Sequence, residues 1–173
     1  GRVLPYTEEG TRQGRAIKTG KELSAFDSDA AAVMKMFAGY SRCTGTVGSM
    51  GFCIGGHLAV RAAALNFVKA CAAFYPSGLH NGTLGVGEEA DTLDRVAGIQ
   101  GECAFFLGNR DDLIPAAGRA VVNERLNAAQ VDFSCHELRG EHAFMRDAGP
   151  SYDPELVRKC YDETIALFRR NLL

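Results

Sequence analysis

Gly51-Phe52-Cys53-Ile54-Gly55-Gly56 is the most informative hexapeptide of the chain. It follows a short apolar, glycine-punctuated run at residues 45–51 that predicts a buried strand, and it precedes an alanine-rich run at 57–67 that predicts a helix. A turn of the form G-x-nucleophile-x-G holds its central residue at a tight strand-to-helix corner, beside the helix N-terminus. That position lowers the pKa of a thiol and offers backbone N–H groups to an oxyanion. Cys53 is therefore a candidate nucleophile, and the alternative is a glycine-rich turn with a buried structural cysteine.

Strand-like and helix-like runs alternate along the rest of the chain. Further strands are predicted at 68–75, 103–107 and 131–138, and further helices at 28–39, at 116–129 and from Asp153 onwards. The polar stretch from Tyr6 to Lys21 predicts a loop, and Asp27 or Ser28 is the expected N-cap of the first helix. The alternation predicts an α/β fold with a parallel sheet, whose ligand site lies beyond the carboxyl ends of the strands.

A thiol nucleophile needs a base, and the base needs an orienting group. His142 follows the last predicted strand directly, in Gly140-Glu141-His142-Ala143-Phe144. The loop after the preceding strand carries two acids, Asp111 and Asp112. Nucleophile, acid and histidine thus follow one another in the chain order of an α/β-hydrolase. Three residue types on three loops that follow strands, in this order, predict a site far more strongly than any one of them.

Two other kinds of site are disfavoured by the sequence. A dinucleotide site needs an acid about 20 residues after its glycine-rich turn, and no Asp or Glu lies between Asp29 and Glu88. Cys53 and His57 have a spacing that suits a metal, but they supply only two ligands. His57 is therefore expected to be an exposed or packing histidine, and His136 to point to one face of the last strand.

On these residues the sequence resembles the dienelactone hydrolase family, the carboxymethylenebutenolidases of the α/β-hydrolase superfamily. The matching stretches are residues 47–56, Phe74-Tyr75, Gly108-Asn109-Arg110-Asp111 with Ile114-Pro115, and 140–144 with Arg146. The resemblance implies an α/β-hydrolase-type, mostly parallel sheet flanked by helices, and a reaction that needs no metal or organic cofactor.

The resemblance also implies roles for individual residues. Cys53 corresponds to the nucleophile, His142 to the base and Asp111 to the orienting acid, because the family pattern favours Asp111 over Asp112. The N–H of Ile54 is expected in the oxyanion hole. Substrate contacts are expected from Tyr75 and from Arg146, whose family counterpart receives the carboxylate of a lactone.

The expected function is hydrolysis of a small ester or lactone through an acyl-thioester. One alternative is a non-catalytic hydrolase-fold protein that binds a small molecule or a partner. A second is a thiol redox protein, although the chain has no C-x-x-C motif.

Two departures from the family pattern carry expectations. Family chains are longer at the N-terminus, so residues 1–173 are expected to form a single hydrolase domain that lacks the N-terminal strands and one oxyanion donor. Glu141 stands where the family often has glycine, and a carboxylate near His142 would raise the pKa of that histidine.

Composition narrows the class of partner. The 173 residues include 19 basic and 21 acidic side chains, a net charge of −2 that gives no attraction to nucleic acid or to an anionic membrane. No apolar stretch approaches the ~20 residues of a membrane span. The six cysteines are too sparse for a disulfide framework, so we expect reduced thiols and a cytoplasmic protein, with Cys71, Cys103 and Cys135 in buried strands. The sequence does not indicate the oligomeric state.

Overall fold

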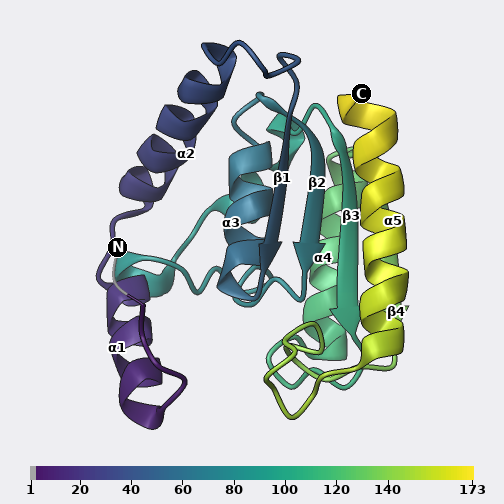
Figure 1. Cartoon of the computed structure of the whole chain (residues 1–173). Helices are drawn as coiled ribbons and strands as arrows, with labels where there is room; N and C mark the ends of the chain where they lie inside the picture. The colour runs from purple at the N-terminus through teal and green to yellow at the C-terminus, as the bar shows by residue number, and fades with distance from the viewer. Residues whose placement is uncertain (1–2) are drawn as a thin grey trace.

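The alternating strands and helices form one parallel sheet covered on both faces (Figure 1). The computed structural model describes residues 3–173. The helices and strands are α1 (Glu8–Thr19), α2 (Leu23–Ala38), β1 (Val47–Phe52), α3 (Ile54–Ala63), β2 (Val68–Phe74), β3 (Glu102–Gly108), α4 (Ala116–Ala128), β4 (Phe133–Leu138) and α5 (Pro154–Leu172). Three short 3-10 helices lie between β2 and β3: η1 (Val86–Glu88), η2 (Thr92–Asp94) and η3 (Val96–Gly98).

The sheet has the order β1-β2-β3-β4, and every neighbouring pair is parallel. Helix α5 covers one face, and α3 and α4 lie on the other, while α1 and α2 stand beyond the β1 edge (Figure 1). The α/β fold with a parallel sheet is thus confirmed. All strands point the same way, so their carboxyl ends meet at one edge of the molecule.

The core is densest in the two central strands. Every residue of β2 except Lys69 is buried, as expected for a strand with helices on both faces. At the carboxyl ends, Phe52, Phe74 and Phe106 are register partners on β1, β2 and β3, and successive rings stack with centroids 4.6 Å apart. His136 on β4 continues the row, 4.9 Å from Phe106. This aromatic row supports the loops that follow the strands.

The prediction of a loop from Tyr6 to Lys21 was wrong, because α1 occupies most of that stretch. The Thr7 side chain caps the helix by accepting a hydrogen bond from the N–H of Gly10, and two glutamates occupy the first turn. Gly10 is the one residue of α1 that is buried. The helix therefore has no apolar stripe from which its period could be read.

Two helices begin earlier than predicted. Helix α2 starts at Leu23, so Asp27 lies inside it and is not its cap; the Asp27 carboxylate instead accepts a hydrogen bond from Arg61 on α3 at 2.6 Å. Helix α3 starts at Ile54, immediately after Cys53, and not at His57. The N-terminus of α3 therefore lies directly at the candidate nucleophile.

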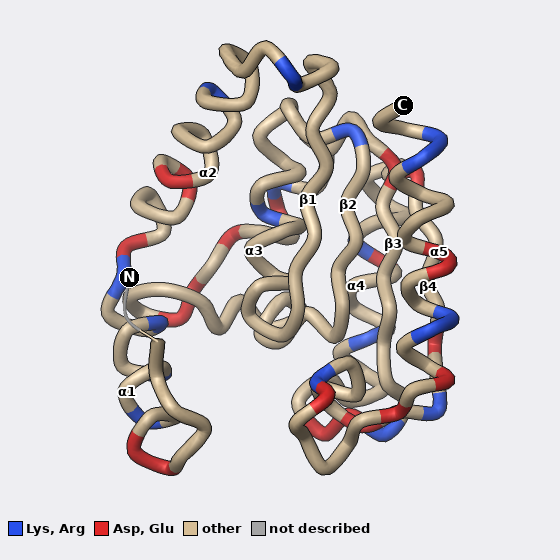
Figure 2. Tube along the Cα trace, in the orientation of Figure 1, with Lys and Arg blue, Asp and Glu red and all other residues tan. Residues whose placement is uncertain are grey.

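Charged side chains follow the layering. Most charged residues lie on the helices and in the loops; β2, β3 and β4 carry one each (Lys69, Glu102 and Glu137), and β1 carries none (Figure 2). Among residues 3–173, no helix is both long and apolar enough to cross a membrane.

The six cysteines are free thiols. Cys71 and Cys103 are buried in β2 and β3, as predicted. Cys135 is only half-buried, because its strand, β4, is at the edge of the sheet.

Candidate active site

The turn between β1 and α3 holds Cys53 in a strained conformation, with φ 55° and ψ −124°. The flanking glycines are required by close backbone approach. A Cβ on Gly51 would lie 1.9 Å from the carbonyl oxygen of Gly55, and one on Gly56 would lie 2.8 Å from that of Phe74. The N–H of Cys53 donates to the Phe74 carbonyl at 3.0 Å, which anchors the turn to the end of β2. The predicted nucleophile corner is present in the structure.

The loops after β3 and β4 are pressed together at two glycines. A Cβ on Gly108 would lie 2.4 Å from the carbonyl oxygen of Gly140, and the N–H of Arg110 donates to the same oxygen at 3.0 Å. The Asp111 side chain is fully buried, and its Oδ1 accepts a hydrogen bond from the N–H of Leu113 at 2.8 Å. This loop closure carries Asp111 toward the segment that follows β4.

His142 joins the other two residues. Its Nδ1 lies 2.7 Å from Asp111 Oδ2, and its Nε2 lies 3.1 Å from Cys53 Sγ. The neighbouring Asp112 is exposed and makes no contact with the imidazole among the described residues. Residues 53, 111 and 142, far apart in the sequence, thus form one hydrogen-bonded chain.

The protonation of this chain follows from its contacts. Burial by itself raises the pKa of Cys53, but hydrogen bonds from His142 and Ser77 outweigh it, so the pKa lies below that of an ordinary thiol. Burial by itself lowers the pKa of His142, but the hydrogen bonds to Asp111 and Cys53 raise it to about 9. Both shifts favour transfer of the thiol proton to the imidazole, which is the imidazolium–thiolate form of the pair.

Glu141 was expected to raise the pKa of His142, and the structure does not bear this out. Its carboxylate accepts a hydrogen bond from the hydroxyl of Ser151 at 2.9 Å instead. The groups that raise the pKa of His142 are Asp111 and Cys53.

Ile54 and Tyr75 both lie near the candidate nucleophile but make different contacts. Ile54 is the first residue of α3, and its N–H points at the sulfur closely enough to lower the pKa of Cys53. The Tyr75 ring is 2% exposed and packs edge-on against His142 and Phe144, with centroids 5.1 Å apart in each pair. Tyr75 thus supports the imidazole, and its contact with substrate stays a prediction.

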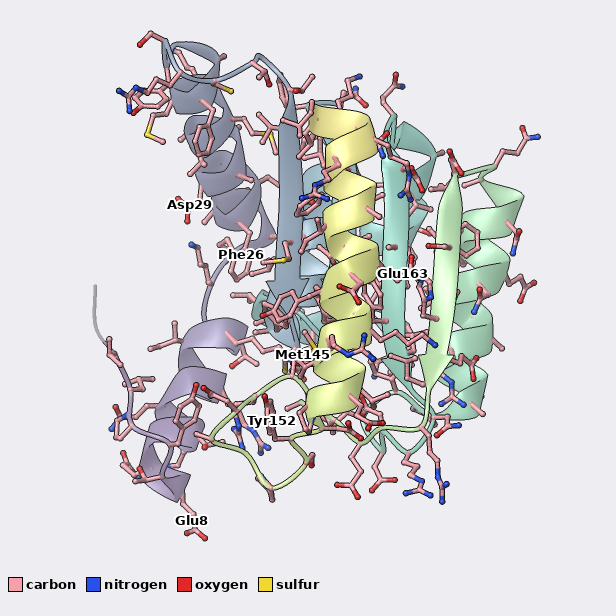
Figure 3. All side chains as sticks on the ribbon, turned by 45° about the vertical axis from the view of Figure 1, so that its right-hand side comes forward. Glu8, Phe26, Asp29, Met145, Tyr152 and Glu163 are labelled. Atoms are coloured by element: carbon pink, nitrogen blue, oxygen red, sulfur yellow. The ribbon has the colours of Figure 1, made fainter. Side chains whose placement is uncertain are left out.

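Arg146 lies further out, in the loop between β4 and α5. That loop, which also carries Met145 and Tyr152, runs below the carboxyl ends of the strands (Figure 3). The guanidinium of Arg146 lies over the ring of Tyr6, 5.0 Å from its centroid. The same two residues line a hollow of about 630 Å³ against α1. A second hollow, of about 410 Å³, is lined by His142 and neighbouring loop residues.

Ser77 has a role near the site that the sequence analysis did not predict, whereas His57 takes one of the two roles expected of it. Ser77 was read only as part of the break after the strand at 68–75, yet its hydroxyl lies 3.3 Å from Cys53 Sγ. The sequence signal that could have indicated Ser77 is its position as a polar residue just after β2, the strand that neighbours the one before Cys53. His57 is fully buried, with Nε2 2.8 Å from the Thr92 hydroxyl, so it is a packing histidine. No group of three metal-ligating side chains occurs among residues 3–173.

The chain is similar to known proteins over most of its length. The model of the dienelactone hydrolase family matches residues 6–172. The chain belongs to the dienelactone hydrolase family. It is 31% identical, over 98% of its length, to a Saccharomyces cerevisiae protein provisionally named a carboxymethylenebutenolidase. It is 27% identical, over 83% of its length, to the carboxymethylenebutenolidase of Pseudomonas sp. strain P51.

The chain covers 65% of the yeast dienelactone hydrolase relative and 56% of the Pseudomonas one. Among solved structures, a dienelactone hydrolase-like promiscuous phosphotriesterase from metagenomic libraries superimposes with a TM-score of 0.72 at 18% identity, covering 99% of this chain and 70% of that one. That likeness shows the α/β-hydrolase fold.

Proposed function

We propose that this protein hydrolyses small esters or lactones, with Cys53 as nucleophile, His142 as proton carrier and Asp111 as the group that orients the imidazole. The observation that supports this most directly is the unbroken series of contacts from the Asp111 carboxylate through both imidazole nitrogens to the Cys53 sulfur. Membership of the dienelactone hydrolase family supports the same reaction class.

In the acylation half, the Cys53 thiolate attacks the substrate carbonyl. The N–H of Ile54 donates to the oxyanion as it forms, because this N–H already faces the sulfur at the start of α3. The imidazolium of His142 then gives its proton to the departing alkoxide, and a thioester on Cys53 remains.

In the deacylation half, neutral His142 takes a proton from water while the water oxygen attacks the thioester carbonyl. The C–S bond breaks, the electron pair returns to sulfur, and the acid leaves. Asp111 keeps Nδ1 of the imidazole protonated in both halves, since its buried carboxylate accepts from that nitrogen. A thiol nucleophile suits activated esters and lactones better than amides.

The substrate class includes a carboxylate that Arg146 receives. The Pseudomonas relative is named for a lactone with a carboxymethylene group, which would carry such a charge. Among residues 3–173, the guanidinium of Arg146 has the Tyr6 ring as a contact and no carboxylate partner, so its charge is available to a substrate carboxylate.

The test is hydrolysis of an activated aryl ester and of a dienelactone, followed by mass spectrometry of the protein quenched during turnover. Cys53→Ala is compared with Cys43→Ala, which removes a half-buried thiol outside the site. We expect turnover and a thioester mass on the Cys53 peptide, both lost in Cys53→Ala and kept in Cys43→Ala. Turnover that survives Cys53→Ala would rule out this nucleophile. If neither ester is hydrolysed, the non-catalytic binding protein becomes the better hypothesis.

A further inference from the structure

A second side chain besides His142 reaches the sulfur of Cys53. The hydroxyl of Ser77 lies 3.3 Å from Sγ, and the backbone N–H of Ser77 donates to the Cys53 carbonyl at 3.2 Å. Ser77 is half-buried, and among residues 3–173 Cys53 is the hydrogen-bond partner of its hydroxyl. Cys53 is thus held by Ser77 at both its backbone and its side chain.

The turn that carries Ser77 is tightly built. Tyr75 has φ 36° and Gly78 has φ 76°, so a residue with positive φ lies on either side of Pro76-Ser77. A Cβ on Gly78 would lie 2.6 Å from the hydroxyl of Thr83. The backbone therefore fixes the place of Ser77 beside Cys53, and the Ser77 hydroxyl lies 3.3 Å from Sγ without a substrate.

Resting on the proposed function, we propose that Ser77 is a third catalytic side chain beside His142 and Asp111: its hydroxyl donates a hydrogen bond to Cys53 Sγ and stabilises the thiolate both as nucleophile and as leaving group. A thiolate has no proton, so Ser77 is the donor whenever Cys53 is ionised. A hydrogen bond to an anion is stronger than one to a neutral thiol. The contact therefore favours the reactive form.

The other donors to the sulfur leave it during the reaction, and Ser77 does not. His142 gives its proton to the departing alkoxide, and the N–H of Ile54 turns to the oxyanion. When water later displaces the sulfur, the C–S electron pair returns to Sγ while His142 holds the proton of the attacking water. The Ser77 hydroxyl then donates to the sulfur that is being released.

A purely structural role would not require the hydroxyl. The turn is already attached to Cys53 through the Ser77 N–H and to the end of β2 through the Cys53 N–H. Removing the hydroxyl leaves both backbone contacts in place.

The experiment measures the reactivity of the Cys53 thiolate directly, without a substrate. The rate of alkylation by iodoacetamide, located at Cys53 by mass spectrometry, is followed from pH 5 to pH 10. Ser77→Ala removes the hydroxyl. Ser77→Thr and Ser77→Val introduce side chains of similar shape, of which threonine keeps the hydroxyl and valine lacks it. Ser49→Ala is the matched control, because the Ser49 hydroxyl donates to the Ala59 carbonyl and does not contact Cys53.

Three other titratable side chains lie around Cys53 and Ser77: those of His142, His57 and Tyr75. His142 is coupled to Cys53 and belongs to the measured profile. Burial lowers the pKa of His57 on α3 to about 4 and raises that of Tyr75, so neither titrates in the middle of the range.

We expect Ser77→Ala and Ser77→Val to slow alkylation about tenfold at pH values below the midpoint, which equals a rise of about one unit in the apparent pKa of Cys53. Ser77→Thr and Ser49→Ala should retain the original profile. Equal profiles for Ser77→Thr and Ser77→Val would overturn the proposal, even if Ser77→Ala does not fold. Because alkylation needs no ester, this result is independent of whether the protein hydrolyses the esters tested above.

Discussion

At the scale of single residues, the state of Cys53 is set by the atoms around its sulfur. His142 Nε2 and the Ser77 hydroxyl both lie within 3.3 Å of Sγ, and the buried Asp111 carboxylate keeps a proton on the other nitrogen of His142. The pKa of Cys53 is lowered and that of His142 is raised for the same reason: the two groups are coupled, and the proton moves from the thiol to the imidazole.

This coupling predicts a bell-shaped dependence of kcat/KM on pH. Activity falls in acid because Cys53 takes up a proton as the pH drops through its lowered pKa. Activity falls in alkali because His142 loses the proton it must give to the leaving group as the pH rises through about 9. Initial rates of aryl-ester hydrolysis from acid to alkaline pH measure both limbs, and a profile that still rises at pH 10 would contradict the imidazolium–thiolate pair.

The two neighbouring acids give a matched comparison. Asp111→Asn removes the buried acceptor of the imidazole and should reduce kcat by about 10²–10⁴-fold, with the alkaline limb displaced to lower pH. Asp112→Asn changes an exposed carboxylate that does not contact His142. As a surface substitution, it should leave kcat within about threefold of the unsubstituted protein's value. Equal losses of kcat in the two variants would mean that the loop changes conformation in solution, so that either acid can contact His142.

At the scale of elements, the site depends on how closely α3 approaches the end of β2. Gly55 and Gly56 are neighbours in the first turn of α3, but their surroundings differ. A Cβ on Gly55 meets nothing within 4 Å, whereas one on Gly56 would lie 2.8 Å from the Phe74 carbonyl oxygen and 3.1 Å from the Cα of Pro76.

Gly56→Ala should therefore destabilise the protein by about 1–3 kcal/mol, as other overpacked positions do, and displace the nucleophile corner. Gly55→Ala should be neutral or stabilising by up to ~1 kcal/mol, because alanine is the better helix former. Denaturant unfolding of both variants measures the difference. Two variants of the same stability would show that α3 can move away from β2 at little cost.

A buried ion pair ties α2 to α3. The guanidinium of Arg61 is 2% exposed and binds the carboxylates of Asp27 on α2 and of Asp91 before η2. Asp29, two residues further along α2, pairs with Lys21 and is 71% exposed. The two aspartates thus make the same kind of contact at very different depths.

Asp27→Ala should lower the free energy of unfolding by about 1.5–3 kcal/mol, because it leaves a buried cation with one partner fewer. Asp29→Ala should change it by less than ~1 kcal/mol, as expected of an exposed pair. Both variants replace Asp by Ala within the same helix, so the change in helix propensity cancels in the comparison. A cost for Asp29→Ala equal to that for Asp27→Ala would contradict the argument from burial.

At the scale of the whole molecule, stability is distributed unevenly between the sheet and the N-terminal helices. Strands β2 and β3 are buried between two helical layers, whereas α1 stands beyond the β1 edge with Gly10 as its buried residue (Figure 1). Local opening should therefore be easiest in α1.

Hydrogen–deuterium exchange would measure this difference. Amides of β2 and β3 should exchange last, at the rate of global unfolding, and those of α1 first, because opening α1 exposes little apolar surface. The peptide that contains α5 serves as an internal reference, since α5 is a long helix packed on the sheet (Figure 3). Exchange in α1 as slow as in β3 would show that α1 is held by more than the contacts described.

The accuracy of the sequence reading varied with the kind of signal each segment carries. The buried strands and the loop order of Cys53, Asp111 and His142 were predicted because apolar runs and glycine-rich turns have local causes. Helix α1 was missed because Ala16 and Ile17 are its only apolar residues besides glycine, too few to predict a helix from the spacing of apolar positions. The starts of α2 and α3 were misplaced because no strong capping residue marks them: Glu22 and Cys53 precede these helices without a side-chain cap.

The order of residues along the chain was enough to predict a parallel α/β sheet and to place a thiol, an acid and a histidine at one edge of it. Periodicity and turn chemistry act over a few residues, and strand direction then brings the loops together. The choice of Asp111 over Asp112 came from the family resemblance, whereas the contact of Asp111 with His142 and the approach of Ser77 to the sulfur depended on the tertiary structure. These contacts result from backbones pressed together at Gly56, Gly108 and Gly140, and such packing joins segments that are far apart in the sequence.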